Sequence, residues 1–209
     1  PQTDARPRAL MHQPLLQHRA HQLGDVVGTV RSVLAVDDAG KAFSSGITSS
    51  LDFPATAALM PPGQRMAGID AFVALWQPQG LKPSYNIIMG GSGGSTNEEA
   101  LDIALDADGN VYLTGRTFSS NFPVTAGAIQ SAYGGGEQAD VFITKIDPQA
   151  KSLIYSTYFG GQNDDYGKAI AVDSAGAAYV AGNTMSWGLP KAVNLNRTYG
   201  TGAFVLKLN

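Results

Sequence analysis

Residues 102–123 read "DIALDADGNVYLTGRTFSSNFP", and the chain contains two close variants of this stretch. The variants are "VLAVDDAGKAFSSGITSSLDFP" at 33–54 and "AIAVDSAGAAYVAGNTMSWGLP" at 169–190. Self-similarity at a fixed interval is the sequence signature of a repeat architecture. The chain therefore contains three repeats, whose shared aspartates Asp37, Asp106 and Asp173 are 69 and 67 residues apart.

A second shared segment follows each copy, and a double glycine closes the first two units. The second segments are "DAFVALWQP" at 70–78, "DVFITKIDP" at 140–148 and "GAFVLKLN" at 202–209, and the glycines are Gly90–Gly91 and Gly160–Gly161.

Each unit is predicted to form four short strands. In the second unit Leu101, Ile103 and Leu105 alternate with polar or small residues, which is the period of a strand with one buried face. The following "ADGN" has the residue types of a tight hairpin turn. "VYLTGRT", "VFITKID" and "SLIYSTYF" supply the other strands. Four antiparallel strands per repeat predict an all-β fold built of β-propeller blades.

The repeat resembles the bacterial β-propeller repeat known as SBBP, and the resemblance covers roughly residues 15–209. The first unit departs from the pattern, since Phe43 replaces a tyrosine and Trp76 stands in place of a lysine. The resemblance implies an extracytoplasmic bacterial scaffold with no single activity. The residues that carry it best are Asp173, Gly176, Tyr179, Gly182 and Thr184, together with Asp140, Phe142, Lys145, Tyr155 and Gly160–Gly161.

The third unit stops before a fourth strand, and the start of the chain contains a degenerate copy of one. Placing Gly24 on Gly161 puts His18 on Tyr155. We therefore expect five segments. They are a tail at 1–14, a closing strand at 15–24, blade 1 at 25–91, blade 2 at 92–161, and blade 3 at 162–209 without its fourth strand.

Three blades are too few for a ring, because propellers have about 4–8. An unpaired strand edge is a template for another chain. The sequence therefore predicts that residues 15–23 of one subunit pair with 203–208 of another, as a six-bladed dimeric ring or a filament. The alternative is that the chain is a fragment of a longer propeller. The predicted association residues are Leu16, His18, Ala20, Phe204, Leu206 and Leu208.

Composition narrows the class of function. Charged residues make up 15%, the net charge is −3, and cysteine is absent. These values argue against a nucleic-acid partner and exclude disulfides and thiolate chemistry. No stretch approaches the ~20 apolar residues of a membrane span. Low charge with many small polar residues, and a first residue other than methionine, favour a processed chain that is secreted or displayed at the cell surface.

No catalytic site is predicted, because the recurring aspartates have the same role in every unit and no nucleophile elbow is present. The turn at Asp106, Asp108 and Asn110 is expected to be a hairpin turn, with calcium binding as the less favoured alternative. Residues 163–165, with two further acids beside a glycine, are expected to lie in a solvated loop. The predicted function is a non-catalytic scaffold that associates with itself. A lectin-like or protein-binding propeller is the second hypothesis, with a glycan or another extracellular protein as partner. The loop residues predicted to contact such a ligand are Trp187, Trp76 and Arg116, although Trp76 also fits a core position.

Overall fold

The structure is a computed structural model, and it describes residues 33–50, 53–60, 68–79, 82–91, 97–189, 193–198 and 201–209, with 193–198 as backbone only. Its described part contains thirteen strands and no helix, so the all-β prediction is confirmed. It accordingly has no helix that could cross a membrane. The predicted tail and closing strand, with Leu16, His18 and Ala20, lie outside the described residues.

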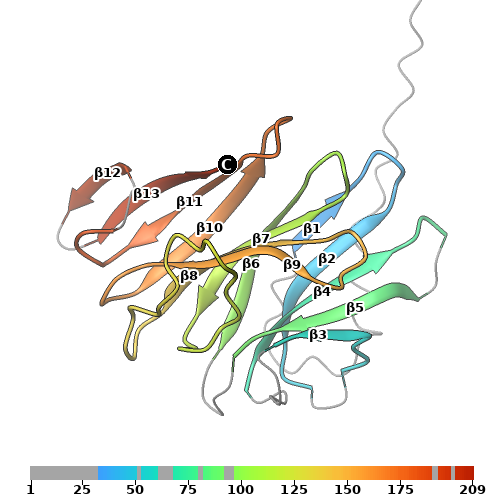
Figure 1. Cartoon of the computed structure of the whole chain (residues 1–209), viewed down its shortest axis with the longest axis horizontal. Helices are drawn as coiled ribbons and strands as arrows, with labels where there is room; N and C mark the ends of the chain where they lie inside the picture. Colours follow the sequence, from blue (N-terminus) through green and yellow to red (C-terminus); the bar gives the residue numbers. More distant parts are fainter. Residues whose placement is uncertain are drawn as a thin grey trace, which may run out of the picture.

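The strands form three sheets, named sheets 1, 2 and 3 in chain order (Figure 1). Sheet 1 has the order β1 (Val33–Val36), β2 (Ala42–Thr48), β4 (Asp70–Trp76), β5 (Pro83–Met89) and β3 (Ala57–Leu59). Sheet 2 has the order β6 (Glu98–Leu105), β7 (Val111–Thr117), β8 (Asp140–Ile146) and β9 (Leu153–Phe159). Sheet 3 has the order β10 (Asp165–Val172), β11 (Ala178–Thr184), β13 (Thr201–Leu208) and β12 (Val193–Thr198).

Sheet 2 lies between sheets 1 and 3, and an apolar layer fills each junction (Figure 1). Between sheets 1 and 2, Phe122 and Phe142 stack with ring centroids 4.9 Å apart. Between sheets 2 and 3, the Phe159 and Phe204 rings lie 5.1 Å apart. Because alternate residues of a strand face opposite sides, each sheet contributes one set of side chains to each neighbouring junction.

The recurring aspartate closes the first hairpin of every sheet. Asp37, Asp106 and Asp173 each accept a hydrogen bond at 2.8–2.9 Å from the amide four residues later. The third residue after each aspartate is a glycine with positive φ, between 79° and 83°, where a side chain would be strained. The predicted hairpin turns are confirmed.

In sheets 1 and 2, the connection between the second and third strands returns to cover the outer edge of the fourth strand. In sheet 1, the Thr56 amide donates to the Asn86 carbonyl at 2.7 Å, and the Asn86 amide donates to the Thr56 hydroxyl at 3.1 Å. In sheet 2, Thr125 and Ser156 make the same two bonds at 3.0 and 2.9 Å. The outer edge of the fourth strand is therefore covered by its own unit, by β3 in sheet 1 and by the connection that contains Thr125 in sheet 2.

Sheet 3 differs from the sequence expectation, because it has four strands instead of three. The additional strand is β12, which comes from the connection after Trp187 and pairs antiparallel with residues 201–205 of β13. The physical reason is that a free edge leaves amides and carbonyls unpaired, and the adjacent connection supplies partners. Within the described residues, β12 does not reach Leu206–Leu208, so the predicted open edge is present over only that part of β13.

Candidate functional site: the junctions between sheets and the two end faces

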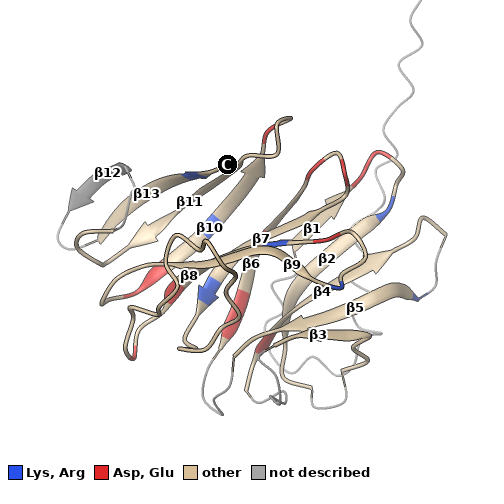
Figure 2. Ribbon diagram, viewed as in Figure 1, with Lys and Arg blue, Asp and Glu red and all other residues tan. Residues whose placement is uncertain are grey.

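Each junction between sheets contains a pair of buried acids. Asp70 and Glu98 lie between sheets 1 and 2, and Asp140 and Asp165 lie between sheets 2 and 3; all four are 0% exposed. They are the first residues of β4, β6, β8 and β10, where Figure 2 shows acidic segments at the strand ends. The sequence prediction of a solvated loop at 163–165 is therefore wrong for Asp165.

The first glycine of each double glycine leaves room for the acid pair. A Cβ at Gly90 would lie 2.2 Å from Asp70 Oδ1 and 3.1 Å from Glu98 Oε2. A Cβ at Gly160 would lie 2.4 Å from Asp140 Oδ1 and 2.9 Å from Asp165 Oδ2. No residue with a side chain fits such contacts without moving the acids. The double glycine is therefore a requirement of the junction.

The second glycine contacts the next sheet. A Cβ at Gly91 would lie 2.3 Å from Ser119 Cβ, and one at Gly161 would lie 2.7 Å from Ser186 Cβ. These serines also bind the acids: the Ser119 hydroxyl donates to Glu98 Oε1 at 2.5 Å, and the Ser186 hydroxyl donates to Asp165 Oδ2 at 2.7 Å. Each junction thus joins a double glycine, a serine and an acid in one hydrogen-bonded unit.

Several acid oxygens in these junctions have no hydrogen-bond partner. They are both oxygens of Asp70, Oε2 of Glu98, and Oδ1 of Asp140 and of Asp165. Burial, and secondly the charge of Glu98, raises the pKa of Asp70 to about 7. Burial raises the pKa of Asp140 to about 7 as well; the Gly134 amide opposes this shift and the charge of Asp165 adds to it. The junctions therefore bind protons close to neutral pH.

The acid pairs do not form a recognisable metal centre. Among the described residues, no group of three His, Cys, Asp or Glu side chains is arranged to hold a metal ion. What the pairs can do chemically is take up and release protons while holding two sheets together.

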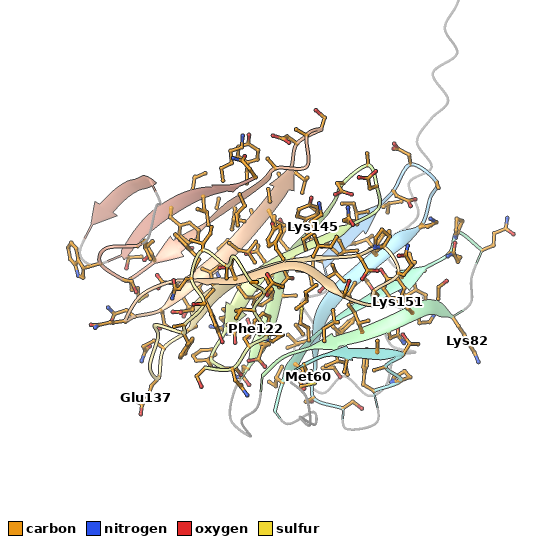
Figure 3. The ribbon with its side chains drawn as sticks, viewed as in Figure 1. Met60, Lys82, Phe122, Glu137, Lys145 and Lys151 are labelled. Atoms are coloured by element: carbon orange, nitrogen blue, oxygen red, sulfur yellow. The ribbon has the colours of Figure 1, made fainter. Side chains whose placement is uncertain are left out.

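The face of sheet 2 toward sheet 3 is buried in the junction between these two sheets. Tyr112, Val141 and Ile143 are completely buried there. The Tyr112 hydroxyl lies 3.0 Å from the Gly176 carbonyl of sheet 3, to which it can donate, and 3.0 Å from Asp106 Oδ2. Lys145, labelled in Figure 3, lies 3.1 Å from that carboxylate oxygen and 4.8 Å from the Tyr112 ring centroid.

The outer face of sheet 3 carries the same arrangement, and no strand of the described residues covers it. Tyr179 and Val205, the counterparts of Tyr112 and Ile143, are 38% and 37% exposed. The Tyr179 hydroxyl donates to Asp173 Oδ2 at 3.1 Å, and Lys207 lies 5.1 Å from the Tyr179 ring centroid. This surface, called the tail face below, is built like a junction but faces solvent.

At the other end of the stack, β1 also exposes apolar side chains. Leu34 and Val36 are 42% and 50% exposed. Their counterparts in sheet 3 are Ile170 and Val172, which pack against sheet 2, and Ile170 is only 7% exposed. Leu34 and Val36 define the head face. The tail face and the head face therefore carry the two halves of one junction.

The predicted association residues of β13 have buried side chains. Phe204, Leu206 and Leu208 face sheet 2 and belong to the apolar layer of that junction. What β13 offers at its edge is backbone, whereas Thr201, Val205 and Lys207 are its exposed side chains. Sequence reasoning identified the strand but not which of its faces is accessible.

The three predicted ligand residues are not brought together. Trp187 is 74% exposed in the connection after β11. Trp76 is buried on β4 and donates its indole N–H to the Ser44 hydroxyl at 3.0 Å, so its assignment as a ligand residue is corrected to a core position. Arg116 is engaged on β7 by Glu99, with hydrogen bonds of 3.1 and 2.7 Å.

Donors occupy the turn that was considered for calcium. Asp106 Oδ2 accepts a hydrogen bond of 2.7 Å from the side-chain amide of Asn110, and the Lys145 ammonium nitrogen lies 3.1 Å from the same oxygen. Burial alone would raise the pKa of Asp106, but these hydrogen bonds lower it below its ordinary value. Asp108 is exposed, and its own amide donates to Asp106. The Lys145 ammonium group thus balances the charge of the Asp106 carboxylate.

Comparison with known families supports the repeat assignment. Residues 154–186 match the family model described as the SBBP beta-propeller repeat, which confirms the resemblance seen in the sequence. No curated protein matches the chain. The matched segment runs from β9 to the end of β11, so it contains the double glycine, Asp165 and Ser186. The match therefore covers the part of the network that sheet 3 contributes with the double glycine, whereas Asp140 lies outside the matched residues.

Proposed function

We propose that this chain, which carries a beta-propeller repeat at 154–186, is a non-catalytic scaffold module that associates with itself head to tail. In this proposal the tail face of one copy packs on the head face of another. Two copies would supply six sheets, within the range of about 4–8 blades in closed propellers. The composition of the chain is consistent with a secreted or cell-surface location.

The observation that carries the proposal is the repetition of junction chemistry on the exposed tail face. Inside the chain, sheet 3 covers the face of sheet 2 that carries Tyr112, Lys145 and Asp106. The same three residue types recur at Tyr179, Lys207 and Asp173 beside solvent. Exposed apolar and aromatic side chains of this kind mark interaction surfaces.

The internal junction also specifies the contact between copies. The Tyr112 hydroxyl reaches the carbonyl of Gly176, the glycine of the next hairpin turn. The corresponding glycine of sheet 1 is Gly40, which has the same positive φ. Tyr179 of one copy would therefore donate to Gly40 of another, with Leu34 packed on Tyr179 and Val205.

Size-exclusion chromatography with light scattering tests the proposal. The wild-type chain is expected to show twice its mass of 21.8 kDa, or larger multiples, at micromolar concentration. Val205→Glu and Leu34→Glu should each give monomers, because a charge in an apolar contact is left unpaired. Ile154→Glu is the matched control, since Ile154 is a similarly exposed apolar residue, 49%, on sheet 2.

Mixing the two monomeric variants tests the head-to-tail geometry. Val205→Glu keeps an intact head face and Leu34→Glu keeps an intact tail face, so an equimolar mixture should form a dimer with a single interface. A monomeric wild-type chain at all concentrations would overturn the proposal. A mixture that stays monomeric would overturn the head-to-tail arrangement.

A second candidate function is ligand binding at Trp187. Its indole is 74% exposed, and exposed tryptophans serve as stacking platforms and interface anchors. Trp76 is buried, so a ligand that quenches fluorescence in the wild type but not in Trp187→Phe would bind at this connection. A glycan panel with no such quenching would count against lectin-like binding.

A further inference from the structure

The segment that follows the Phe-Pro or Leu-Pro pair takes two different places in the three sheets. In sheets 1 and 2, it lies outside the fourth strand, where Thr56 bonds Asn86 and Thr125 bonds Ser156. In sheet 1, it also forms β3, which runs parallel to β5. In sheet 3, the corresponding segment is β12. It pairs directly with β13, in the position that the fourth strand occupies in the other two sheets.

As a fourth strand, β12 fits poorly. It makes five paired positions with β13, and a register shift between Asn194 and Asn196 interrupts them. By contrast, β9 makes six paired positions with β8, and their one register shift lies at the end of β8, between Lys145 and Ile146, so that Val141–Lys145 pair without interruption. The segment "VNLNRT" also contains two asparagines, which are depleted in strands. Its sequence and its register both indicate that β12 pairs weakly with β13.

Among the described residues β12 pairs only with 201–205 of β13, and the end of β13 beyond them borders a hollow of about 270 Å³. On one side of it lie Lys207, Leu208 and Asn209, at the end of β13. On the other side lie Tyr155–Thr157 of β9 and the connection at 127–129. Because successive sheets pack face to face, this is where the first half of a fourth strand in sheet 3 would pack against the fourth strand of sheet 2.

From these observations we propose that the outer edge of β13 is an acceptor site for an extended strand, and that β12 is a displaceable cover. The incoming strand pairs with residues 203–208 and fills the hollow, while β12 moves outward to the capping position seen for Thr56 and Thr125. Strand addition of this kind uses main-chain hydrogen bonds for affinity. The cover protects the edge from indiscriminate pairing until the correct strand arrives.

The occupant is the segment at 15–24 of a second copy, and this assignment rests on the proposed self-association. The segment aligns with the fourth strand of sheet 2, with Leu16 at Leu153 and Gly24 at Gly161. It precedes sheet 1, and sheet 2 separates sheet 1 from β13 (Figure 1). Head-to-tail contact would bring the start of one copy beside the open edge of another.

A reversible lock on β12 tests the proposal in the full chain. Val193 and Val205 are cross-strand partners, and the chain has no cysteine of its own. Directly opposite residues of antiparallel strands have Cα separations that a disulfide can bridge. Val193→Cys with Val205→Cys therefore holds β12 in place when oxidised and frees it when reduced. Val205→Cys alone is the control.

The probes are labelled peptides of residues 15–24 and 152–161, the second being an authentic fourth strand, and binding is read by fluorescence anisotropy. A version of each peptide with two consecutive central prolines lacks the necessary amides. Oxidation of the double variant should weaken binding of the unmodified peptides at least about tenfold, because the competent state is removed. Reduction should restore it, and the single-cysteine control should not change.

The possible outcomes separate this inference from the proposed function. If oxidised and reduced forms bind the peptides equally, β12 is not the cover. If neither peptide binds the reduced double variant carrying Leu34→Glu, which as a monomer leaves the acceptor unoccupied, while light scattering of the wild-type chain still shows association, the strand acceptor is overturned and self-association stands. If the peptides bind as expected but the chain is always monomeric, the acceptor stands and self-association is overturned.

Discussion

Raising the pH from 5 to 8 should weaken the fold, because Asp70 and Asp140 carry protons in the folded state that they lose on unfolding. The pKa of each is raised from 3.8 to about 7 in the folded protein. A raised carboxyl pKa means that the folded state binds more protons than the unfolded state between these values. Its contribution to stability is therefore complete below pH 3.8 and is lost as the pH rises to 7.

The size of the effect follows from the proton count. One extra proton in the folded state changes the free energy of unfolding by about 1.4 kcal/mol per pH unit. Between pH 5 and 7, where each carboxyl is protonated only when folded, one group contributes about 2.5 kcal/mol and the pair about 5 kcal/mol. A domain of this kind is typically stable by only about 5–15 kcal/mol. The fold should thus lose a large part of its stability.

Asp140→Asn isolates one of the two groups. The side-chain oxygen can still accept from the Gly134 amide, as Oδ2 does now at 2.8 Å. The introduced amide takes the place of Oδ1, which has no hydrogen-bond partner, and removes the group that binds the proton. The variant should lose about half of the pH dependence and gain about 2 kcal/mol over wild type at pH 8. Asp108→Asn, in an exposed turn, is the matched control and should leave the profile unchanged.

Urea unfolding followed by tryptophan fluorescence at pH 5, 6, 7 and 8 provides the measurement. Protein concentration is held constant because association would itself change apparent stability, and EDTA excludes divalent cations. The wild-type midpoint should fall steadily with pH, and the profile of Asp140→Asn should be flatter. A wild-type midpoint that is constant or rises from pH 5 to 8 would refute the reasoning, as would an unchanged slope in Asp140→Asn.

Three further changes test the junctions by the same urea assay. Gly160→Ala should destabilise the fold by about 1–3 kcal/mol, because its Cβ would lie 2.4 Å from Asp140 Oδ1; unchanged stability would show that the junction has slack. Phe142→Ala should cost about 3–5 kcal/mol, because the ring is fully buried between sheets 1 and 2, and a cost below 1 kcal/mol would contradict that packing. Tyr112→Phe should cost about 1 kcal/mol more than Tyr179→Phe in the monomer, because only the first hydroxyl contacts the next sheet; equal costs would argue against the bond across the junction.

The repeat made most of the fold predictable from the sequence. "VYLTGRT" forms β7, and the strands predicted at 141–147 and 152–159 match β8 and β9 to within one residue at each end. These assignments succeed because turn chemistry recurs at fixed offsets: each hairpin has an aspartate followed by a glycine three residues later. A signal repeated in several units is far less ambiguous than the same signal seen once.

The unpredicted features are those that depend on contacts between units. The acid at the start of β10 was assigned to a loop because its charge suggests solvent, yet it is completely buried. A signal was available: Glu98 and Asp165 both lie eight residues before the recurring aspartate, and both follow a double glycine. The pairing of β12 with β13 could not be predicted from the sequence of β12 itself. It depends on the edge of β13, which pairs with β12 because the third unit has no counterpart of β5 or β9.

The distribution of the acid pairs bears on how copies join. The counterpart of Asp70 and Asp140 in the third unit is Gly202, and the counterpart of Glu98 and Asp165 in the first unit is Thr29, which lies outside the described residues. The acids are thus present as pairs within the chain and absent together from its ends. A single acid buried at such a contact would still be destabilising, because burial of a carboxyl group is unfavourable. The absence of both acids avoids that effect. In the proposed association, the contact between copies would therefore lack the groups that titrate near pH 7, and rising pH should weaken the sheets of one copy before it weakens that contact.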